Sequence, residues 1–205
     1  MYLVGLTGGI ASGKSYVASL LGELGASTVD ADQVAREVVI PGSTGLVQVV
    51  GAFGFEILSP SGELDRAKLG EIVFADPEKR IELENILHPL IKARTTQLIG
   101  QQPSEIVVYA VPLLVEANVD YPFDTIITVE AGVENQVSRL MTSRQMSESE
   151  ARARIGAQTS SYDRAARANF VIDSSGPKEQ TRLQVVEVWK QLLEAAKAKG
   201  YSAAN

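Results

Sequence analysis

The segment from Gly8 to Ser15, Gly-Gly-Ile-Ala-Ser-Gly-Lys-Ser, carries residue types that bind phosphate at the spacing G-x-x-x-x-G-K-S/T. Glycines let the backbone fold around an anion, so that successive N–H groups and the N-terminus of a following helix point at phosphate oxygens. Lys14 adds a positive charge near the β- and γ-phosphates, and Ser15 can offer its hydroxyl to Mg²⁺. A glycine-rich turn that served only tight packing would have no use for this lysine. The segment therefore predicts a phosphate loop (P-loop) for ATP and Mg²⁺.

Two carboxylates, Asp30 and Asp32, follow the short apolar run 27–29, which we interpret as a strand. In a doubly wound sheet both would lie at the carboxyl edge, where ligands bind. One carboxylate could accept the proton of an attacking hydroxyl while the other supports the metal, because phosphoryl transfer requires little beyond positioning and charge control. The alternative is that either aspartate caps the following helix.

Several arginines and no lysine occur between residues 139 and 167 of this acidic chain: Arg139, Arg144, Arg152, Arg154, Arg164 and Arg167. Guanidinium groups make bidentate contacts with phosphate, so a short helix-loop-helix could carry them over bound ATP as a lid. Two of them follow a glutamate by one helical turn, Arg152 after Glu148 and Arg154 after Glu150, and we expect ion pairs there on a solvated face. The better candidates for phosphate ligands are Arg139, Arg144 and Arg164.

Short apolar runs alternate with helical patterns along the chain, which is typical of a parallel sheet flanked by helices. The runs that we interpret as strands are 2–6, 27–29, 106–111, 125–129 and 170–172. After the P-loop, the spacing of Val17, Leu20 and Leu21 predicts an amphipathic helix, and Gly25 supplies its end. The predicted fold is α/β, a P-loop NTPase-type parallel five-stranded sheet flanked by helices, with a helical insertion and a short helical lid.

We expect a single domain over residues 1–205, with a core of about 1–35, 104–135 and 168–200, an insertion of about 36–103 and a lid of about 139–167. Within the insertion, Asp65 and Asp76-Pro77 indicate helix starts, an N-cap followed in the second case by proline at the first helical position. His88-Pro89 predicts a kink. As the only histidine, His88 is either a functional residue or a structural hydrogen-bonding group.

The composition limits the classes of protein that remain. The chain is 45% hydrophobic, contains no cysteine and has a formal net charge of −6, which argues against broad attraction to nucleic acid or to an anionic membrane. Without cysteine there is neither a disulfide framework nor a thiolate nucleophile. The first residues contain no basic segment ahead of an apolar one, and no apolar run is long enough to cross a bilayer, so we expect a cytoplasmic protein.

Taken in order, these motifs resemble the dephospho-coenzyme A kinase family. The resemblance runs from the first strand to the loop after the fifth and rests on Leu6 to Ile10 leading into the P-loop, Asp30-Ala31-Asp32, Ala35 to Val39 with Pro41-Gly42, His88-Pro89-Leu90-Ile91, Val111 to Glu116, and Gln158 ahead of Arg164. It implies a substrate-binding helical insertion, an arginine-bearing lid, and transfer of phosphate from ATP to the 3′-hydroxyl of the ribose of dephospho-coenzyme A.

The resemblance also assigns roles to residues. It implies that Asp32, Lys14 and Arg139 are catalytic and that Ser15 binds the metal. The residues implied to bind ATP are Gly9, Ala11, Ser12, Gly13, Lys14, Ser15, Tyr16 and Arg144. Those implied to bind the second substrate are Asp32, His88, Leu113 and Arg164.

The chain departs from the family pattern at three positions. Tyr16 stands where threonine is frequent, Ser161 replaces an arginine of some members, and Ser174 occupies the place of a frequent asparagine, which leaves open how adenine is held. The run 106–111 contains no acidic residue, so Mg²⁺ would depend on Ser15, phosphates, waters and Asp32.

Two other functions stay open on the sequence alone. One is another small-molecule or nucleotide kinase with the same sheet, and the other is a non-catalytic nucleotide-binding module. A GTPase lacks support, because no lysine lies in an Asn/Thr-Lys-x-Asp guanine-binding motif. We expect the protein to be a monomer or a small homo-oligomer.

Overall fold

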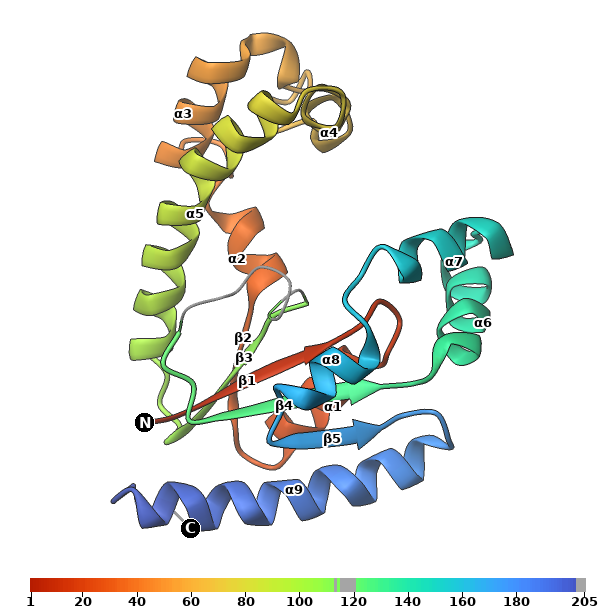
Figure 1. Ribbon diagram of the computed structural model, residues 1–205. Coiled ribbons are helices and arrows are strands. Elements are labelled where there is room, and N and C mark those ends of the chain that lie inside the picture. The colour runs from red at the N-terminus through yellow and green to blue at the C-terminus, as the bar shows by residue number, and fades with distance from the viewer. Residues whose placement is uncertain (113, 115–120, 202–205) are drawn as a thin grey trace. The chain divides into compact units, whose positions relative to one another are not determined.

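The computed structural model describes residues 1–112, 114 and 121–201 (Figure 1). The chain divides into two compact units, one formed by Met1–Asp30 together with the chain from Gln102 onward, the other by Ala31–Gln101. None of the helices in these residues is long and apolar enough to cross a membrane. Leu113, one of the candidate substrate ligands, lies outside the described residues.

The first unit is built on five parallel strands in the order β2-β3-β1-β4-β5. The strands are β1 (Tyr2–Gly8), β2 (Ser27–Asp30), β3 (Ile106–Ala110), β4 (Thr125–Glu130) and β5 (Phe170–Asp173). This confirms the predicted fold class and all five strands. Because the strands are parallel and in register, the last residue of each lies at one common edge of the sheet.

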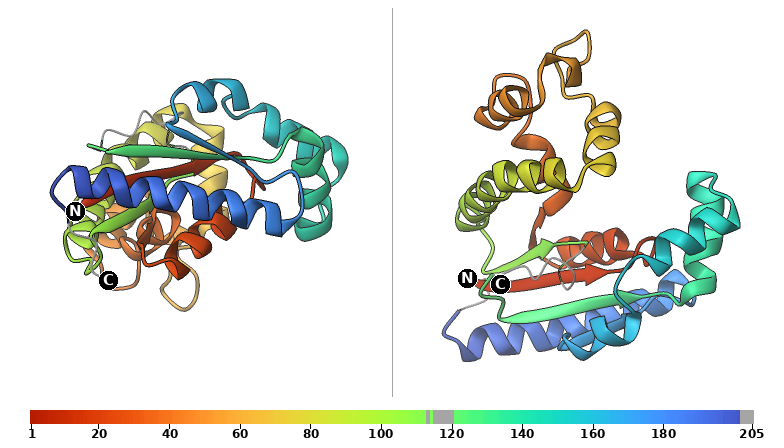
Figure 2. Two further views of the ribbon diagram at one scale, coloured as in Figure 1. Left: turned by 90° about the horizontal axis from the view of Figure 1, so that it is seen from below. Right: turned by 45° about the horizontal axis from the view of Figure 1, so that its top comes forward.

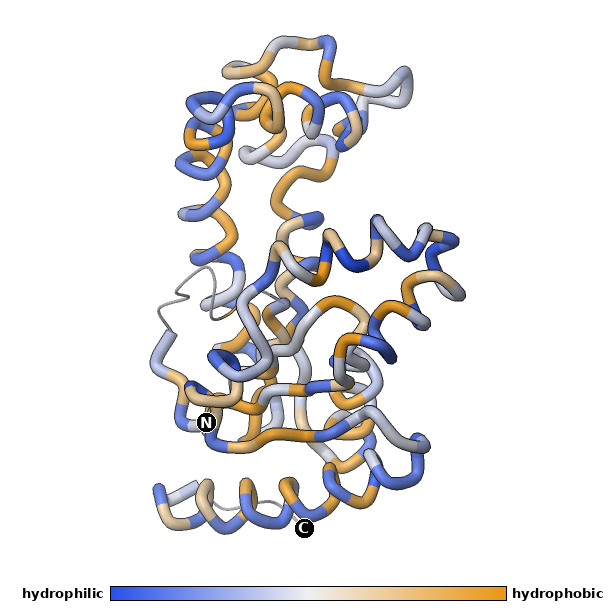
Figure 3. The backbone as a smooth tube through the Cα atoms, turned by 45° about the vertical axis from the view of Figure 1, so that its right-hand side comes forward, coloured by the Kyte–Doolittle hydropathy of each residue, from blue (hydrophilic) through white to orange (hydrophobic). Residues whose placement is uncertain are grey.

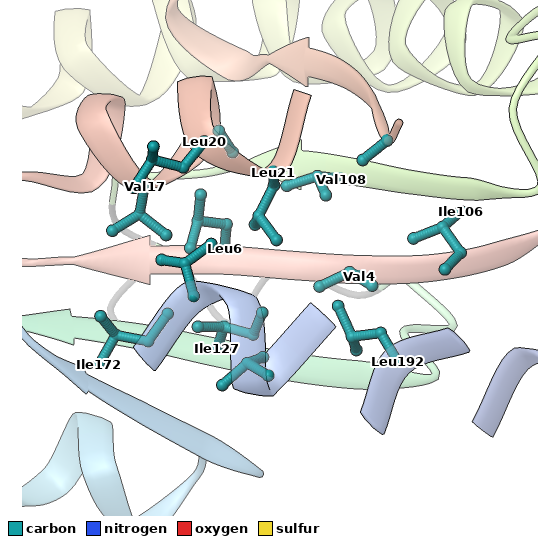
Figure 4. Packing of buried hydrophobic residues seen from close by; sticks show 14 of the residues in the cluster. Val4, Leu6, Val17, Leu20, Leu21, Ile106, Val108, Ile127, Ile172 and Leu192 are labelled. Atoms are coloured by element: carbon teal, nitrogen blue, oxygen red, sulfur yellow. The ribbon is translucent and has the colours of Figure 1, made fainter. Parts of the chain in front are cut away.

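One face of the sheet is covered by α1 (Lys14–Glu23) and α9 (Lys178–Ala198), as Figures 2 and 4 show. Alternate residues of β1, such as Val4 and Leu6, point into this layer and meet Leu21 of α1 and Leu192 of α9, all of them essentially fully buried. Hydrophobic and hydrophilic residues alternate along α9 (Figure 3), as expected for a helix with one buried face. The helix α1 ends just before Gly25, whose φ of 115° favours glycine, as the sequence predicted.

Three short helices follow β4: α6 (Val133–Arg144), α7 (Glu148–Gly156) and α8 (Ser161–Ala166). The first of them begins before the segment 139–167 that was predicted as a lid, and its function as a lid stays a prediction. A capping box between Ser147 and Glu150 begins α7. Arg152 pairs with Glu148, as predicted, and also makes a bidentate contact with Glu134 of α6, with nitrogen–oxygen distances of 3.0 and 2.9 Å. These contacts raise the pKa of Arg152 and lower that of Glu134. Since these groups are exposed, the contacts link α6 to α7 with little contribution to stability.

The second unit consists of α2 (Ala31–Glu37), α3 (Thr44–Phe53), η1 (Phe55–Ile57), α4 (Arg66–Ala75) and α5 (Pro77–Gly100). Its own small core contains Val49, Phe53 and Leu69. The guanidinium of Arg94 on α5 donates to Glu37 of α2 over 3.0 and 3.1 Å, which ties the two helices together.

Both predicted helix starts in this unit are confirmed. The Asp65 carboxylate accepts hydrogen bonds from the backbone N–H groups at the start of α4, and Asp76 does the same for α5, with Pro77 as the first helical residue. The helix α5 continues through Pro89, so the proline does not end it.

The N-cap of α5 generates a stability prediction. Asp76 Oδ1 accepts from the N–H groups of Glu78 at 2.8 Å and Lys79 at 3.3 Å, so Asp76→Ala should lower the free energy of unfolding by about 1 kcal/mol. Urea denaturation followed by circular dichroism measures this loss. The matched control, Asp76→Ser, keeps a side-chain acceptor and should retain most of the stability. Equal losses in the two variants would contradict the capping role.

Candidate nucleotide-binding and active site

The P-loop connects the end of β1 at Gly8 to the start of α1 at Lys14, which is the context that the motif requires. Two residues of the loop have positive φ angles, Ala11 at 57° and Gly13 at 93°. For Gly13 this conformation is easily adopted, whereas for Ala11 it is unfavourable and must be held by its surroundings. Within the loop, the N–H of Ser12 donates to the carbonyl of Gly9 at 3.0 Å.

The loop presents hydrogen-bond donors that the protein itself does not use. Among the described residues, no acceptor is found for the backbone N–H groups of Ala11, Gly13, Lys14 and Ser15. The ammonium group of Lys14 likewise has no ion-pair partner in this part of the chain. Unpaired N–H groups at a helix N-terminus beside a free cation form an anion site. The loop therefore fits the phosphates of a nucleotide.

The carbonyl groups of the loop, in contrast, are held by side chains from elsewhere in the unit. Arg139 of α6 donates from Nη1 to the carbonyl of Ala11 at 3.1 Å and from Nη2 to the carbonyl of Ser174 at 2.5 Å. The hydroxyl of Ser174 in turn donates to the carbonyl of Ser12. Arg139, predicted to be catalytic, thus lies at the P-loop and is engaged with its backbone. Its role in the reaction stays a prediction.

Two glutamines bind the backbone of Ile10, one at its carbonyl and one at its N–H. The side-chain amide nitrogen of Gln136, on α6, donates to the Ile10 carbonyl at 2.6 Å, and the side-chain oxygen of Gln158, after α7, accepts from the Ile10 N–H at 2.8 Å. Gln136 is only 4% exposed. Gln158 belongs to the motifs that resemble the family, whereas Gln136 was not predicted, because a single glutamine in a helix has no signal that separates it from a surface residue.

Arg164, predicted to bind substrate, is buried and paired with Glu130 at the end of β4. Its guanidinium donates to both carboxylate oxygens of Glu130 at 2.8 Å and to the carbonyl of Thr159 at 2.5 Å. A Cβ added to Gly9 would lie 3.0 Å from Nη2 of Arg164 and 2.7 Å from the amide nitrogen of Gln136, so a larger residue here would displace these hydrogen-bonded groups. In this structure, Arg164 thus lies beside Gly9 of the P-loop; a substrate contact stays a prediction.

The turn after β5 is fixed by Asp173, whose carboxylate accepts from the N–H of Ser175 at 2.8 Å. Hydrogen bonds from the hydroxyl and backbone of Ser175 lower the pKa of the Asp173 carboxyl below its usual 3.8. Ser174, which binds the P-loop, is therefore held in place on both sides. Next to it, the Tyr16 ring contacts Lys178 at the start of α9, with the ammonium 5.2 Å from the ring centroid. This contact gives the tyrosine at this position a structural partner.

The remaining candidates are exposed. Arg144 lies in the last turn of α6, and within the described ranges no hydrogen bond or ion pair is found for it. In the second unit, Asp32 lies in the first turn of α2, two residues after β2 ends at Asp30, and His88 lies on α5. The side chains of the described residues include no group of three or more acidic, histidine or cysteine residues that could hold a metal.

A parallel sheet with a phosphate loop after its central strand, and with unpaired N–H groups in that loop, defines a P-loop nucleotide-binding protein. The family model for dephospho-CoA kinase matches residues 2–180. The chain is 50% identical to a dephospho-CoA kinase from Thermobifida fusca, over 94% of this chain and 96% of the relative. It is 46% identical to one from Streptomyces avermitilis, covering 98% and 99%. Among solved structures, TT1252 from Thermus thermophilus superposes with a TM-score of 0.80 at 29% identity, covering 93% and 97%. The chain belongs to the dephospho-CoA kinase family.

The buried pair of Arg164 and Glu130, with side chains 4% and 14% exposed, generates a second prediction. Arg164→Met should cost about 3–5 kcal/mol, because it leaves a buried carboxylate without its partner. Replacing both residues by methionine should recover most of this loss. The free energies of unfolding of the two single variants and the double variant, measured in urea, test the coupling. A double variant that regains stability but not turnover would show that Arg164 or Glu130 is needed for the reaction and not only for the fold. A double variant as unstable as Arg164→Met would contradict the pairing argument.

Proposed function

We propose that the protein transfers the γ-phosphoryl group of ATP to the 3′-hydroxyl of the ribose of dephospho-coenzyme A, which yields coenzyme A and ADP. The observation that carries the proposal is the state of the P-loop. Its N–H groups and its lysine are available to an anion, while the carbonyl groups of residues 10–12 accept hydrogen bonds from side chains of the protein. The identity of the acceptor, dephospho-coenzyme A, is inferred from membership of the family. The acceptor oxygen forms a bond to the γ-phosphorus, the bond to the bridging oxygen of ADP breaks, and the hydroxyl proton leaves to a base.

Each candidate residue has a role in this reaction. The backbone of residues 9–16 binds the β- and γ-phosphates, and Lys14 neutralises charge on them as the bond to ADP breaks. Arg144, exposed and near the end of α6, is proposed to contact ATP, and Arg139 the transferring group. Asp32 is proposed to orient the acceptor hydroxyl and take its proton. His88, Leu113 and Arg164 are proposed to bind dephospho-coenzyme A.

Magnesium fits the site only as part of a nucleotide complex. The described residues offer no cluster of carboxylates, so the Ser15 hydroxyl would hold the ion together with phosphate oxygens and water, with Asp32 as a further carboxylate. The ion would supply charge neutralisation at the β- and γ-phosphates. The cytoplasm, where thiols stay reduced, is the proposed location of this cysteine-free chain, acting as a monomer or small homo-oligomer.

One experiment tests the function directly. The purified protein is incubated with ATP, Mg²⁺ and dephospho-coenzyme A, and coenzyme A is sought by mass spectrometry. Parallel reactions with nucleosides and nucleoside monophosphates test the alternative of another small-molecule kinase. Phosphoryl transfer to dephospho-coenzyme A, and to none of the other acceptors, supports the proposal. Faster transfer to another acceptor, or ATP binding without any transfer, would overturn it in favour of one of the two alternatives.

Lys14→Ala should reduce turnover by orders of magnitude, because the positive charge at the β- and γ-phosphates is lost during binding and transfer. Initial rates at saturating dephospho-coenzyme A measure the effect. Lys197→Ala serves as the control, since this exposed lysine lies in the last turn of α9, far along the chain from the loop. Near-normal transfer by Lys14→Ala would remove the P-loop from the mechanism.

Asp32→Asn keeps the size of the side chain and deletes its charge. If the carboxylate takes the proton in the transition state, kcat should fall at least about a hundredfold while the dissociation constant for ATP changes little. Calorimetry measures the ATP affinity separately. Asp30→Asn, at the end of β2, is the matched control and should have the milder effect. The reverse order of the two, or an Asp32→Asn variant that mainly weakens Mg²⁺·ATP binding, would exclude Asp32 as the base.

A further inference from the structure

The two glutamines that bind Ile10 use atoms of opposite chemistry. The Ile10 carbonyl can only accept and its N–H can only donate, so Gln136 must present its amide nitrogen and Gln158 its oxygen. Both bonds are short, at 2.6 and 2.8 Å. The Ile10 side chain also packs against the cluster that Val137, Leu140 and Ala151 form between α6 and α7. This residue of the P-loop is therefore fixed by polar and apolar contacts alike.

The geometry of the peptide bond turns these contacts into control of the loop. In a trans peptide the carbonyl of one residue and the N–H of the next lie in one plane and point in opposite directions. Gln136 holds the Ile10 carbonyl, so the Ala11 N–H points the other way, and this N–H has no acceptor among the described residues. Gln158 holds the Ile10 N–H, so the Gly9 carbonyl points the other way, where it accepts from Ser12.

The same contacts offset an unfavourable backbone conformation. Ala11 has a φ of 57°, which costs a residue with a side chain about 1 kcal/mol or more. The planes on both sides of Ala11 are held, by Gln136 at the Ile10 carbonyl and by Arg139 at the Ala11 carbonyl. Without these donors the loop could relax by rotating those planes, which would turn N–H groups away from an anion.

We propose that Gln136 and Gln158 are positioning residues of the P-loop, which orient the peptide planes on either side of Ile10 and so aim the Ala11 N–H at the nucleotide phosphate. The proposal rests on the proposed use of ATP, and neither glutamine needs to touch the nucleotide. Gln136 acts as an obligatory donor and Gln158 as an obligatory acceptor. This difference in polarity distinguishes positioning from simple space filling.

The same substitution at the two positions separates these roles. Gln158→Glu keeps an oxygen that can accept from the Ile10 N–H, whereas Gln136→Glu places an oxygen against the Ile10 carbonyl and removes the donor. Both variants add one negative charge near the loop, and because Gln136 is buried and Gln158 half-buried, the neutral variant Gln136→Met described below separates loss of the donor from the effect of the charge. Each variant is checked for its fold by circular dichroism and thermal melting without nucleotide. The dissociation constants for Mg²⁺·ADP are then measured by calorimetry, which requires no acceptor and no turnover.

We expect Gln136→Glu to weaken Mg²⁺·ADP binding about tenfold more than Gln158→Glu, as an unpaired buried carbonyl would. The KM for ATP should rise in the same order, while the KM for dephospho-coenzyme A should stay unchanged in both variants. A purely structural role would lower the melting temperature and the active fraction but leave the affinity of the folded protein for ADP unaltered. Equal weakening by the two glutamates would overturn the proposal.

A neutral variant covers the case in which Gln136→Glu does not fold. Gln136→Met fills a similar volume without a donor or a charge, and it should weaken Mg²⁺·ADP binding by a similar factor. Wild-type affinity in this variant, or failure of both variants to fold, would show that Gln136 serves the fold and not the loop. If the wild type binds Mg²⁺·ADP but makes no coenzyme A, the proposed reaction fails while the role of the glutamines is still decided by the calorimetry.

Discussion

A phosphate loop has to satisfy two opposite demands: its N–H groups must stay unpaired, and its carbonyl groups must not. In this protein the N–H groups of Ala11, Gly13 and Lys14 find no acceptor among the described residues. The carbonyls of residues 10, 11 and 12 each receive a donor, from Gln136, Arg139 and Ser174. A buried amide or carbonyl without a partner is costly, so this division is maintained only while those donors are in place.

The rest of the first unit can be understood as the means of bringing these donors together. Gln136 and Arg139 lie on α6, which follows β4, and Ser174 follows β5. Since β1, β4 and β5 are neighbours in a parallel sheet, the segments that leave their carboxyl ends meet at one edge. The buried pair of Glu130 and Arg164 lies at the same edge, beneath Gly9. The strand order thus places the supporting side chains around the loop.

Features set by neighbouring residues could be predicted from the sequence, and features set by distant ones could not. The strands, the Asp65 and Asp76 caps and the pairing of Arg152 with Glu148 follow from local spacing. The second partner of Arg152, Glu134, lies 18 residues away and was not foreseen.

The place of the P-loop between a strand and a helix could be predicted because its motif is contiguous in the chain, whereas the residues that support the loop come from distant segments. Gln136 and Ile10 are separated by 126 residues, and a glutamine has no charge or shape that would mark it. Arg164 was noticed for its charge, yet its partner Glu130, 34 residues before it, was not. Only the sheet topology brings such pairs together.

The place of the second unit in the chain has a consequence for biosynthesis. Residues 31–101 are inserted between β2 and β3, so the first strand, which pairs Val4 with Val108 and Thr125, is synthesised long before its neighbours. At roughly 5–20 residues per second, Ser174 emerges about ten seconds or more after the loop that it binds. Until then the Ser12 carbonyl lacks the hydroxyl of Ser174, so we expect the loop of the nascent chain to bind ATP less well than that of the folded protein. Stabilisation by bound nucleotide should therefore reach its full extent only after synthesis has passed the fifth strand.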